Sequence, residues 1–492
     1  MGAIASTPTF ALQPSSKQVA LSTNYITDFN FLNQYLPDTY EKEFERYGNR
    51  SISSFLRMVG AEMPSMSDKI IWAEQGRLHI KYTNCTTALA ATEVTTATFT
   101  INDTYNLPQY TPAQKVSPIA IRVGQTVAIT PSVSTSLGST TLMIKGVVTA
   151  VTTGNSVPAG TGTNGTITVA FYSPFLNSSA ANQFTIFIYG SEFQKGVVGM
   201  DGSLTPEDLI FDNKPIILKD KYAVSGSEMA QIGWVEVTTE NGATGYLWYL
   251  KAEHETRLRF DDYLETAMVE AVPATTGSGA ATLGLTGSKG VFNQVETYGN
   301  IFTGNIAALS DFDAIVGRLD KQGAIEENVL FLDRTTSFQI DDTLAGLNGY
   351  NSSGVSNFAS FGLFDNNKDM ALNLGFSGFR RGYDFYKTDW KYLNDPTMRG
   401  DIQQTAARVE GLLVPAGSTS VYDQIMGKNA KRPFLHVRYR ASEAEDRRYK
   451  TWVTGSAGGA SNSSLDAMEV NFLSERCVCV LGANNFVLFK GA

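Results

Sequence analysis

The sequence predicts an α+β protein that carries an inserted all-β domain. Three observations predict this class: a long segment with a charged helical pattern, a stretch almost free of charge and rich in short β runs, and a mixed helix–strand region after the helix. At 492 residues the chain is long enough for about two to four domains of usual size. A hydrophobic content of 42% can supply packed cores, so the chain is not expected to be disordered.

The first part of the chain has no steady hydrophobic period. Residues 1–37 mix Ser, Thr, Asn and Pro with scattered apolar residues, so either an extended arm that packs on something else or a disordered tail is expected. A helix is predicted next in DTYEKEFERYG, with Asp38 or Thr39 as its N-cap. The segment DKIIWAEQGRLHIKY, 68–82, predicts a strand with a turn or bulge near Gly76.

Charge then almost disappears between Thr83 and Gly190, where the charged residues are Glu93, Asp103, Lys115, Arg122 and Lys145. Short β-rich runs recur there: IAIRV, QTVAIT, TTLMIKGVVTAVTT, GTITVAFYS and FTIFIYG. Clusters of Gly, Ser, Asn and Pro separate them, which is typical of a small all-β sandwich or barrel. We therefore expect a self-contained domain inserted into a longer framework. Further strands, KPIILKDKY and IGWVEVTT, are expected between 191 and 243.

A long helix is predicted in GYLWYLKAEHETRLRFDDYLETAMVEA, 245–271. Nothing breaks the pattern before Pro273, so the helix could extend for about 40 Å. An apolar stripe is formed by Phe260, Leu264, Ala267, Met268 and Ala271. The middle is charged on every side, and two acid–base pairs at i,i+4 spacing would support it: Glu253 with Arg257, and Glu255 with Arg259. We interpret the polar surface as one that faces water.

The second half of the chain alternates between helix and strand patterns. After Pro273, the stretch ATTGSGAATLGLTGSKG reads as a loop. LSDFDAIVGRLDKQG predicts a helix with Ser310 as its cap, Asp313 three residues later, and Gly323 as its end. NVLFLD predicts a buried strand and SFQIDDTLAGL a helix, which together indicate a mixed α/β domain. From RPFLHVRYR onward the pattern is mostly strand and turn.

The search for chemistry predicts no catalytic, cofactor-binding or metal-ligating residue. The histidines show no ligand spacing; they are His79, His254 and His436. Three cysteines give no disulfide framework, and the two in RCVCVLG, Cys477 and Cys479, are expected on one face of a strand as a buried structural pair. GLTGSKG departs from a phosphate loop because a serine separates its last glycine from the lysine. No apolar run reaches the length of a membrane span, and no secretory signal is expected.

Charged clusters also have ordinary explanations. Adjacent acids on a helix point about 100° apart and form no dyad; the pairs are Asp261/Asp262, Glu326/Glu327 and Asp341/Asp342. A net charge of −9 argues against a dedicated nucleic-acid binder. The basic stretch 428–450 could face phosphates. We prefer a solvated face whose acids pair with neighbouring arginines; these acids are Glu443, Glu445 and Asp446.

Four strings together resemble the major capsid proteins of crAss-like tailed bacteriophages: IIWAEQGRLHIKY, RFDDYLETAM, VEGLLVPAGS and MEVNFLSERCVCVLGANNF. The resemblance spans nearly the whole chain. It implies the tailed-phage major capsid fold, the Hong Kong phage architecture also found in the herpesvirus capsid floor. On this basis the expected parts are an N-terminal arm (1–60), two arms of an extended loop (61–82 and 191–243), the inserted all-β domain (83–190), a peripheral domain with a spine helix (244–304), an α/β axial domain (305–427) and the return of the peripheral domain (428–492).

The same resemblance implies a structural function without enzymatic activity or cofactors. A major capsid protein self-assembles as hexamers and pentamers into the icosahedral head that encloses the packaged double-stranded DNA of a tailed phage. The implied partners are copies of the chain itself, portal and auxiliary or head-fibre capsid proteins, and packaged DNA through non-specific inner-surface contact, with no membrane. The implied location is the virion, after assembly in the host bacterial cytoplasm. Two alternatives stay open: a β-rich phage tail or fibre adhesin that binds host glycans, and a glycosidase that assembles its carboxylates from distant segments.

Overall fold

The computed structural model describes most of the sequence after residue 54, with gaps. The described residues are 55–56, 61–76, 79–88, 93–102, 119–131, 143–152, 165–175, 183–202, 208–232, 236–238, 244–245, 248–304, 306, 308–323, 325–348, 378–400, 402, 407–423, 428–459 and 461–491. Helices and strands both build the fold, which confirms the α+β class. The described residues divide into two compact units: one comprises those of Ala223–Glu255 and Gly455–Met468, and the other comprises those of Arg50–Tyr222, Thr256–Thr454 and Glu469–Ala492.

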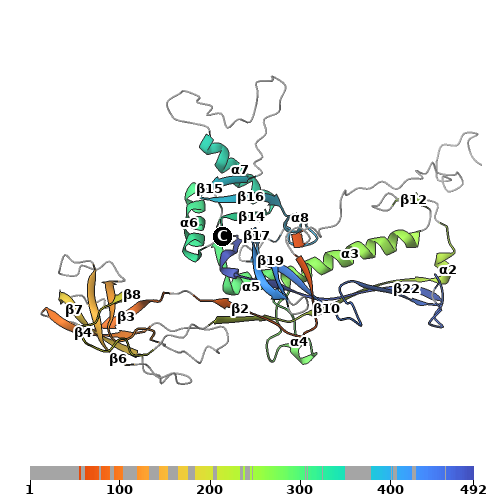
Figure 1. Ribbon diagram of the computed structural model, residues 1–492. Helices are drawn as coiled ribbons and strands as arrows, with labels where there is room; N and C mark the ends of the chain where they lie inside the picture. Colours follow the sequence, from red (N-terminus) through yellow and green to blue (C-terminus); the bar gives the residue numbers. More distant parts are fainter. Residues whose placement is uncertain are drawn as a thin grey trace, which may run out of the picture. The chain divides into compact units, whose positions relative to one another are not determined.

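Six antiparallel strands close into a barrel in the order β3-β4-β7-β6-β5-β8 (Figure 1). They are β3 (Lys81–Thr87), β4 (Val94–Ile101), β5 (Gln125–Pro131), β6 (Ile144–Thr152), β7 (Gly165–Phe175) and β8 (Phe184–Ser191). Inward-pointing residues form one apolar core, which includes Cys85, Phe99, Ile101, Val127, Ile129, Val148, Ile167, Val169, Phe184 and Ile186. Closure gives every strand two neighbours and so leaves no open sheet edge.

Four of the five predicted β runs form strands of this barrel. The fifth, IAIRV, is wrong as a strand: it joins no ladder, although Ile119 and Ile121 are buried in the barrel core. The Tyr82 hydroxyl accepts the backbone N–H of Ala120 at 2.7 Å, so a side chain satisfies a group that a neighbouring strand would otherwise bind. β4 has no counterpart among the predicted runs, although threonine, a residue enriched in strands, fills half of its positions. That the barrel is an independent inserted domain stays a prediction.

A mixed six-stranded sheet has the order β13-β23-β17-β14-β16-β15. Its strands are β13 (Asn300–Thr303), β14 (Glu327–Leu332), β15 (Gly378–Arg381), β16 (Tyr383–Asp389), β17 (Val409–Pro415) and β23 (Val487–Lys490). Two helices, α6 (Leu309–Gln322) and α7 (Arg334–Asn348), pack on it and add to its core the side chains of Phe312, Ile315, Leu319 and Ile340. The predicted strand NVLFLD is confirmed as β14, and the predicted helix SFQIDDTLAGL as α7.

Helix α6 begins two residues earlier than the sequence predicts. Its N-cap is Ala308 rather than Ser310, and the Asp311 carboxylate accepts the backbone N–H of Ala308 at 2.9 Å. This contact is the half of a capping box that needs no hydroxyl on the cap residue. Ser310 therefore lies inside the first turn. Gly323 ends the helix in the left-handed region at φ 70°, as predicted.

A second sheet of five strands has the order β1-β20-β22-β10, and β21 pairs with β22 beside this path. Its strands are β1 (Ala61–Ser65), β10 (Ile216–Ser225), β20 (Leu435–Arg440), β21 (Lys450–Gly455) and β22 (Ala467–Val480). The long helix α3 (Trp248–Glu270) is confirmed (Figure 1). Of its predicted stripe, Phe260, Leu264 and Met268 are buried. The Phe260 ring lies 5.7 Å from the ring of Phe472 on β22.

The remaining elements are short. Three two-stranded ribbons pair β2 (Ile70–Gln75) with β9 (Asp208–Asn213), β11 (Val237–Thr238) with β12 (Thr244–Gly245), and β18 (Ser418–Asp423) with β19 (Lys428–Pro433). Short helices are α2 (Gly226–Met229), α4 (Gly279–Thr282), α5 (Val291–Tyr298), α8 (Lys391–Asn394) and the 3₁₀ helix η3 (Ala483–Asn485). The predicted strand 68–82 is thus two strands, β2 and β3, in different sheets. The arm 1–37 and the helix predicted in DTYEKEFERYG lie outside the described residues.

Candidate assembly surface

The polar residues of α3 contact neighbouring segments of the same chain. Arg259 donates from Nε and Nη2 to Asp220 Oδ2 on β10, both at 3.1 Å. The buried Glu265 accepts the backbone N–H of Phe55 at 2.8 Å. Near the end of the helix, Glu270 forms an ion pair with Arg399. The polar surface of α3 therefore partly anchors other elements of the chain, which corrects the expectation that this surface only faces water.

Glu270 is held by two donors, and this excludes it as a free catalytic acid. The Tyr392 hydroxyl donates to Glu270 Oε1 at 2.6 Å, and Arg399 Nη2 donates to Oε2 at 2.8 Å. Burial and the hydrogen bond to Glu270 raise the pKa of Tyr392, so it stays a donor at neutral pH. A pocket of about 400 Å³ adjoins this cluster, and Phe260, Tyr263 and other apolar side chains line it. Its one carboxylate is already paired.

The base of the β2–β9 ribbon is fastened by a single buried side chain, Asn213, which is 2% exposed. Its Nδ2 donates to the carbonyl oxygens of Lys289 at 2.8 Å and Val478 at 2.6 Å. Its Oδ1 accepts from the N–H groups of Lys289 and Lys214 at 2.9 and 2.8 Å and from the Ser288 hydroxyl at 3.1 Å. One carboxamide thus connects β9, the turn before α5, and β22.

An ion pair beside Asn213 reinforces the same attachment. Asp212 lies 2.9 Å from Lys289 Nζ and 3.4 Å from Lys69 Nζ. Partial burial works in the opposite direction, but the two ammonium groups hold the pKa of Asp212 below its ordinary value. The lysine of GLTGSKG therefore binds a carboxylate of this chain, which explains its presence without a phosphate ligand.

The two faces of the ribbon differ in their contacts. On one face, the rings of Trp72 and Phe211 stack at 6.1 Å, and the Phe211 ring meets that of Tyr298 at 5.0 Å. The other face carries Ile71 and Ile210, which are 58% and 49% exposed. Strand alternation puts these two isoleucines on the same face, because Ala73 lies opposite Ile210 and two residues from Ile71. The same face also carries Asp208 and Asp212, so its exposed apolar area is limited to the two isoleucines and Ala73. An isolated two-stranded ribbon is marginally stable in water, so we treat these exposed isoleucines as a candidate contact with a partner.

The segment between the barrel and β9 continues this apolar exposure. Residues 191–202 are all exposed, and four of them are large and apolar: Phe193, Val197, Val198 and Met200. Val198 is 88% exposed, which is high for a residue of this type. We use the name ribbon surface for the exposed large apolar residues of the ribbon face and of this segment: Ile71, Ile210, Phe193, Val197, Val198 and Met200. Sequence reasoning names no residue of this surface, because exposure of an apolar side chain depends on which segments pair.

Part of the basic stretch 428–450 is neutralised by ion pairs within the chain. Arg447 lies 2.7 Å from Glu475, and Lys450 lies 2.5 Å from Glu445. Further ion pairs join Arg448 to Glu62 and Arg440 to Asp68. The prediction that the acids of 443–446 pair with neighbouring arginines is wrong in its partners: Glu445 pairs with Lys450, and the arginines pair with acids from elsewhere in the chain. Cations paired in this way are less available to phosphates.

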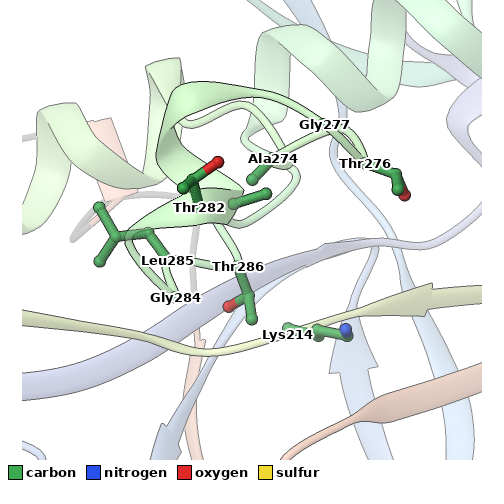
Figure 2. Close-up of a pocket in the computed structure, with 9 residues that line it drawn as sticks. Lys214, Ala274, Thr276, Gly277, Thr282, Gly284, Leu285 and Thr286 are labelled. Atoms are coloured by element: carbon green, nitrogen blue, oxygen red, sulfur yellow. The ribbon is translucent and has the colours of Figure 1, made fainter.

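The glycine-rich stretch after α3 folds back on itself around an open pocket. Figure 2 shows Leu285, Thr286 and Lys214 on the side of this segment near Gly284, whereas Gly277 lies at the other end of the helical turn. The pocket has a volume of about 490 Å³ and is lined by small residues and backbone, with Lys214 as its one charged side chain. A pocket without convergent titratable groups offers no acid–base chemistry. The predicted loop is confirmed, with the one-turn helix α4 inside it.

The residues considered for chemistry lie apart. His79 is exposed, whereas His436 is buried on β20 opposite Cys479. Cys477 and Cys479 are 0% and 1% exposed on β22, which confirms the predicted buried pair. Among the described residues, no group of three or more His, Cys, Asp or Glu could hold a metal ion. In the same part of the chain, no helix combines the length and apolar composition of a membrane span.

Comparisons with known proteins give remote likenesses only. No family model and no curated protein matches the chain. A structure from Microbacterium phage Oxtober96 is 8% identical, has a TM-score of 0.37, and the match covers 94% of this chain and 97% of the other. The capsid structure of cyanophage P-SCSP1u is 8% identical with a TM-score of 0.32, covering 62% and 80%. The mature capsid of bacteriophage PhiM1 is 10% identical with a TM-score of 0.32, covering 61% and 78%. TM-scores this low do not establish a common fold, so function has to be argued from the residues of this chain.

Proposed function

We propose that the chain is the major capsid protein of a tailed bacteriophage, a structural subunit without enzymatic activity. Copies assemble as hexamers and pentamers into the icosahedral head that encloses double-stranded DNA. The observation that carries this proposal is the ribbon surface, because Ile71, Ile210 and the exposed segment 191–202 leave apolar area that one copy does not cover. The sequence resemblance to crAss-like phage capsid proteins supports it independently.

The strand pairing supports the assignment of an extended loop. β2 lies in the arm 61–82 and β9 in the arm 191–243, and six residue pairs join them in antiparallel register. The barrel falls between these two strands in the sequence, as an insertion into such a loop requires. We assign 1–60 to the N-terminal arm, 83–190 to the inserted domain, and 244–304, with α3 as its spine helix, to the peripheral domain. The axial domain is 305–427, and 428–492 returns through the peripheral domain.

Contacts between copies need only modest energy at each ribbon. Completing the burial of a half-exposed isoleucine contributes about 1–1.5 kcal/mol, so Ile71 and Ile210 together supply about 2–3 kcal/mol per contact. Such a contact is weak between two isolated chains. In a closed shell each subunit is held by several neighbours at once, and the combined avidity far exceeds any single contact.

The charge pattern limits the role of DNA in this proposal. Four cations of 428–450 are paired within the chain: Arg440, Arg447, Arg448 and Lys450. Packaged DNA would meet the subunit only through non-specific contact. Portal and auxiliary or head-fibre proteins would complete the particle. The site of action is the virion, after assembly in the host bacterial cytoplasm.

Electron microscopy of the purified full-length chain tests the proposal. Wild type should form closed shells or hexameric rings, and I71K/I210K should stay dispersed because each contact then buries a charge. The matched control I71L/I210L keeps the apolar face and should assemble. Circular dichroism and monomer unfolding establish that all three fold. Trimeric rods would favour the fibre adhesin instead, and assembly of the lysine variant equal to wild type would remove the ribbon surface from the argument.

A further inference from the structure

A group of exposed aromatic and charged side chains lies on the outside of the barrel and includes none of the exposed apolar residues of the ribbon surface. Tyr172 on β7 and Tyr189 on β8 are 53% and 48% exposed. Lys145 on β6 lies over the Tyr189 ring, with Nζ 5.3 Å from its centroid. The Tyr172 hydroxyl donates to the carboxylate of Glu192. We call Tyr172, Tyr189, Lys145 and Glu192 the tyrosine platform.

The barrel register shows how these side chains come together. Gly146 lies opposite Phe171, so the next outward pair along the two strands is Lys145 and Tyr172. β5 stands between β6 and β8, so Lys145 reaches Tyr189 by crossing β5. The platform therefore extends over four neighbouring strands, β7, β6, β5 and β8, a width of about 14 Å.

The platform is preorganised before any ligand binds. Glu192 fixes the Tyr172 hydroxyl, and Lys145 is held over an aromatic ring. The hydrogen bond to Glu192, followed by partial burial and the neighbouring Tyr189, raises the pKa of Tyr172 to about 12. The Tyr172 hydroxyl therefore stays protonated at neutral pH. Side chains held in this way lose little conformational entropy on binding.

We propose that the tyrosine platform binds a neutral glycan, with a pyranose ring stacked on Tyr172. The negative face of an aromatic ring attracts the slightly positive C–H groups of a sugar ring. Lys145, Glu192 and the tyrosine hydroxyls offer the donors and acceptors that sugar hydroxyls need. The charges of Lys145 and Glu192 cancel, and the chain carries a net charge of −9, so a neutral sugar fits better than a sialylated one.

The size of the platform favours a sugar over a protein partner. Four side chains at about half exposure offer roughly 400 Å², whereas a standard protein interface buries about 800 Å² on each partner. A disaccharide covers the smaller area. This inference does not depend on shell assembly, because it concerns the outer face of the barrel and can be measured on dispersed subunits.

A printed array of neutral and sialylated oligosaccharides, read with fluorescently labelled full-length protein, tests the proposal. The best ligand is then titrated by saturation-transfer NMR. We expect binding to neutral glycans, and a loss of affinity of roughly tenfold in Y172A, because one aromatic contact is worth about 0.5–1.5 kcal/mol. Y172F keeps the ring and should retain most of the affinity. Y386A is a matched control, since Tyr386 lies on β16 outside the barrel and is also 53% exposed.

Three results would overturn the proposal. The first is that no neutral glycan binds at concentrations up to roughly 10 mM, which corresponds to negligible affinity. The second is that Y172A binds as well as wild type, or that Y386A loses as much affinity as Y172A. The third is that Y172A abolishes contact between copies while leaving glycan binding intact, which would make the platform a protein interface. Circular dichroism of Y172A and Y172F confirms that the barrel is folded in each comparison.

Discussion

The substitution Asn213→Ala should loosen the β2–β9 ribbon without unfolding the sheets. The carbonyl groups of Lys289 and Val478, which accept hydrogen bonds from Asn213 Nδ2, both keep a second donor, Gln294 Nε2, at 2.7 and 3.1 Å. The loss therefore falls on the part-buried Lys289 N–H and the buried Ser288 hydroxyl, which lose their acceptor Oδ1. Each unsatisfied buried donor costs about 1–3 kcal/mol, so local stability should fall by about 3 kcal/mol.

Amide hydrogen exchange measures this loss where it occurs. A decrease of about 3 kcal/mol accelerates exchange through local opening by roughly a hundredfold, and the acceleration should be confined to 70–75 and 208–213. The control Asn471→Ala removes a half-buried carboxamide with longer bonds, 3.2 Å to Thr454 and 3.4 Å to a backbone oxygen, and should have little effect. Unchanged exchange in the ribbon, or equal acceleration in both variants, would refute the role assigned to Asn213.

Three further outcomes can be measured on the same protein. G455A should lose at least about 3 kcal/mol of unfolding free energy in urea, because φ is +129° at this position and the new Cβ would lie 1.8 Å from a backbone oxygen. The control G459A, where the new Cβ would enter open space, should lose only about 1 kcal/mol. The phenolate absorbance of Tyr172, identified by its loss in Y172F, should titrate at about pH 12. E192Q should lower this pKa towards 10, and an unchanged pKa would contradict the hydrogen bond between Tyr172 and Glu192. Because the pKa of Asp212 is lowered in the folded protein, its ion pairs stabilise the fold above the ordinary carboxyl pKa, and this stability is lost as pH falls through the lower folded value. D212N should therefore reduce the pH dependence of the urea midpoint between about pH 2 and 5. An unchanged pH dependence would contradict the role of the ion pairs.

Elements whose signal is local were predictable from the sequence. The helix period over 245–271 and the absence of a breaker before Pro273 predict α3 to within a few residues. Gly323 marks the end of α6 because only a residue free of Cβ strain takes the left-handed conformation there at low cost. The start of α6 could not be predicted, because its N-cap residue Ala308 has no side-chain hydroxyl that would mark the position in the sequence. Local chemistry thus predicts element types better than their first residues.

Features that depend on distant pairing could not be predicted. Asn213 binds Val478, 265 residues away, and nothing near either residue signals the contact. Exposure of Ile71 follows from the pairing of β2 with β9 rather than from its own neighbours in sequence. Tyr172 and Tyr189 come together only because the barrel closes with β6 and β5 between their strands. The surfaces that carry both proposals are therefore products of topology.

The position of the last two strands has a consequence for biosynthesis. β22 lies between β20 and β10, and β23 lies between β13 and β17, so each is an interior strand of its sheet. A ribosome that has made everything up to residue 466 has therefore produced two sheets that are each missing a middle member. A chain whose translation stops early cannot complete either sheet, and cellular quality control can remove it before it assembles with other copies.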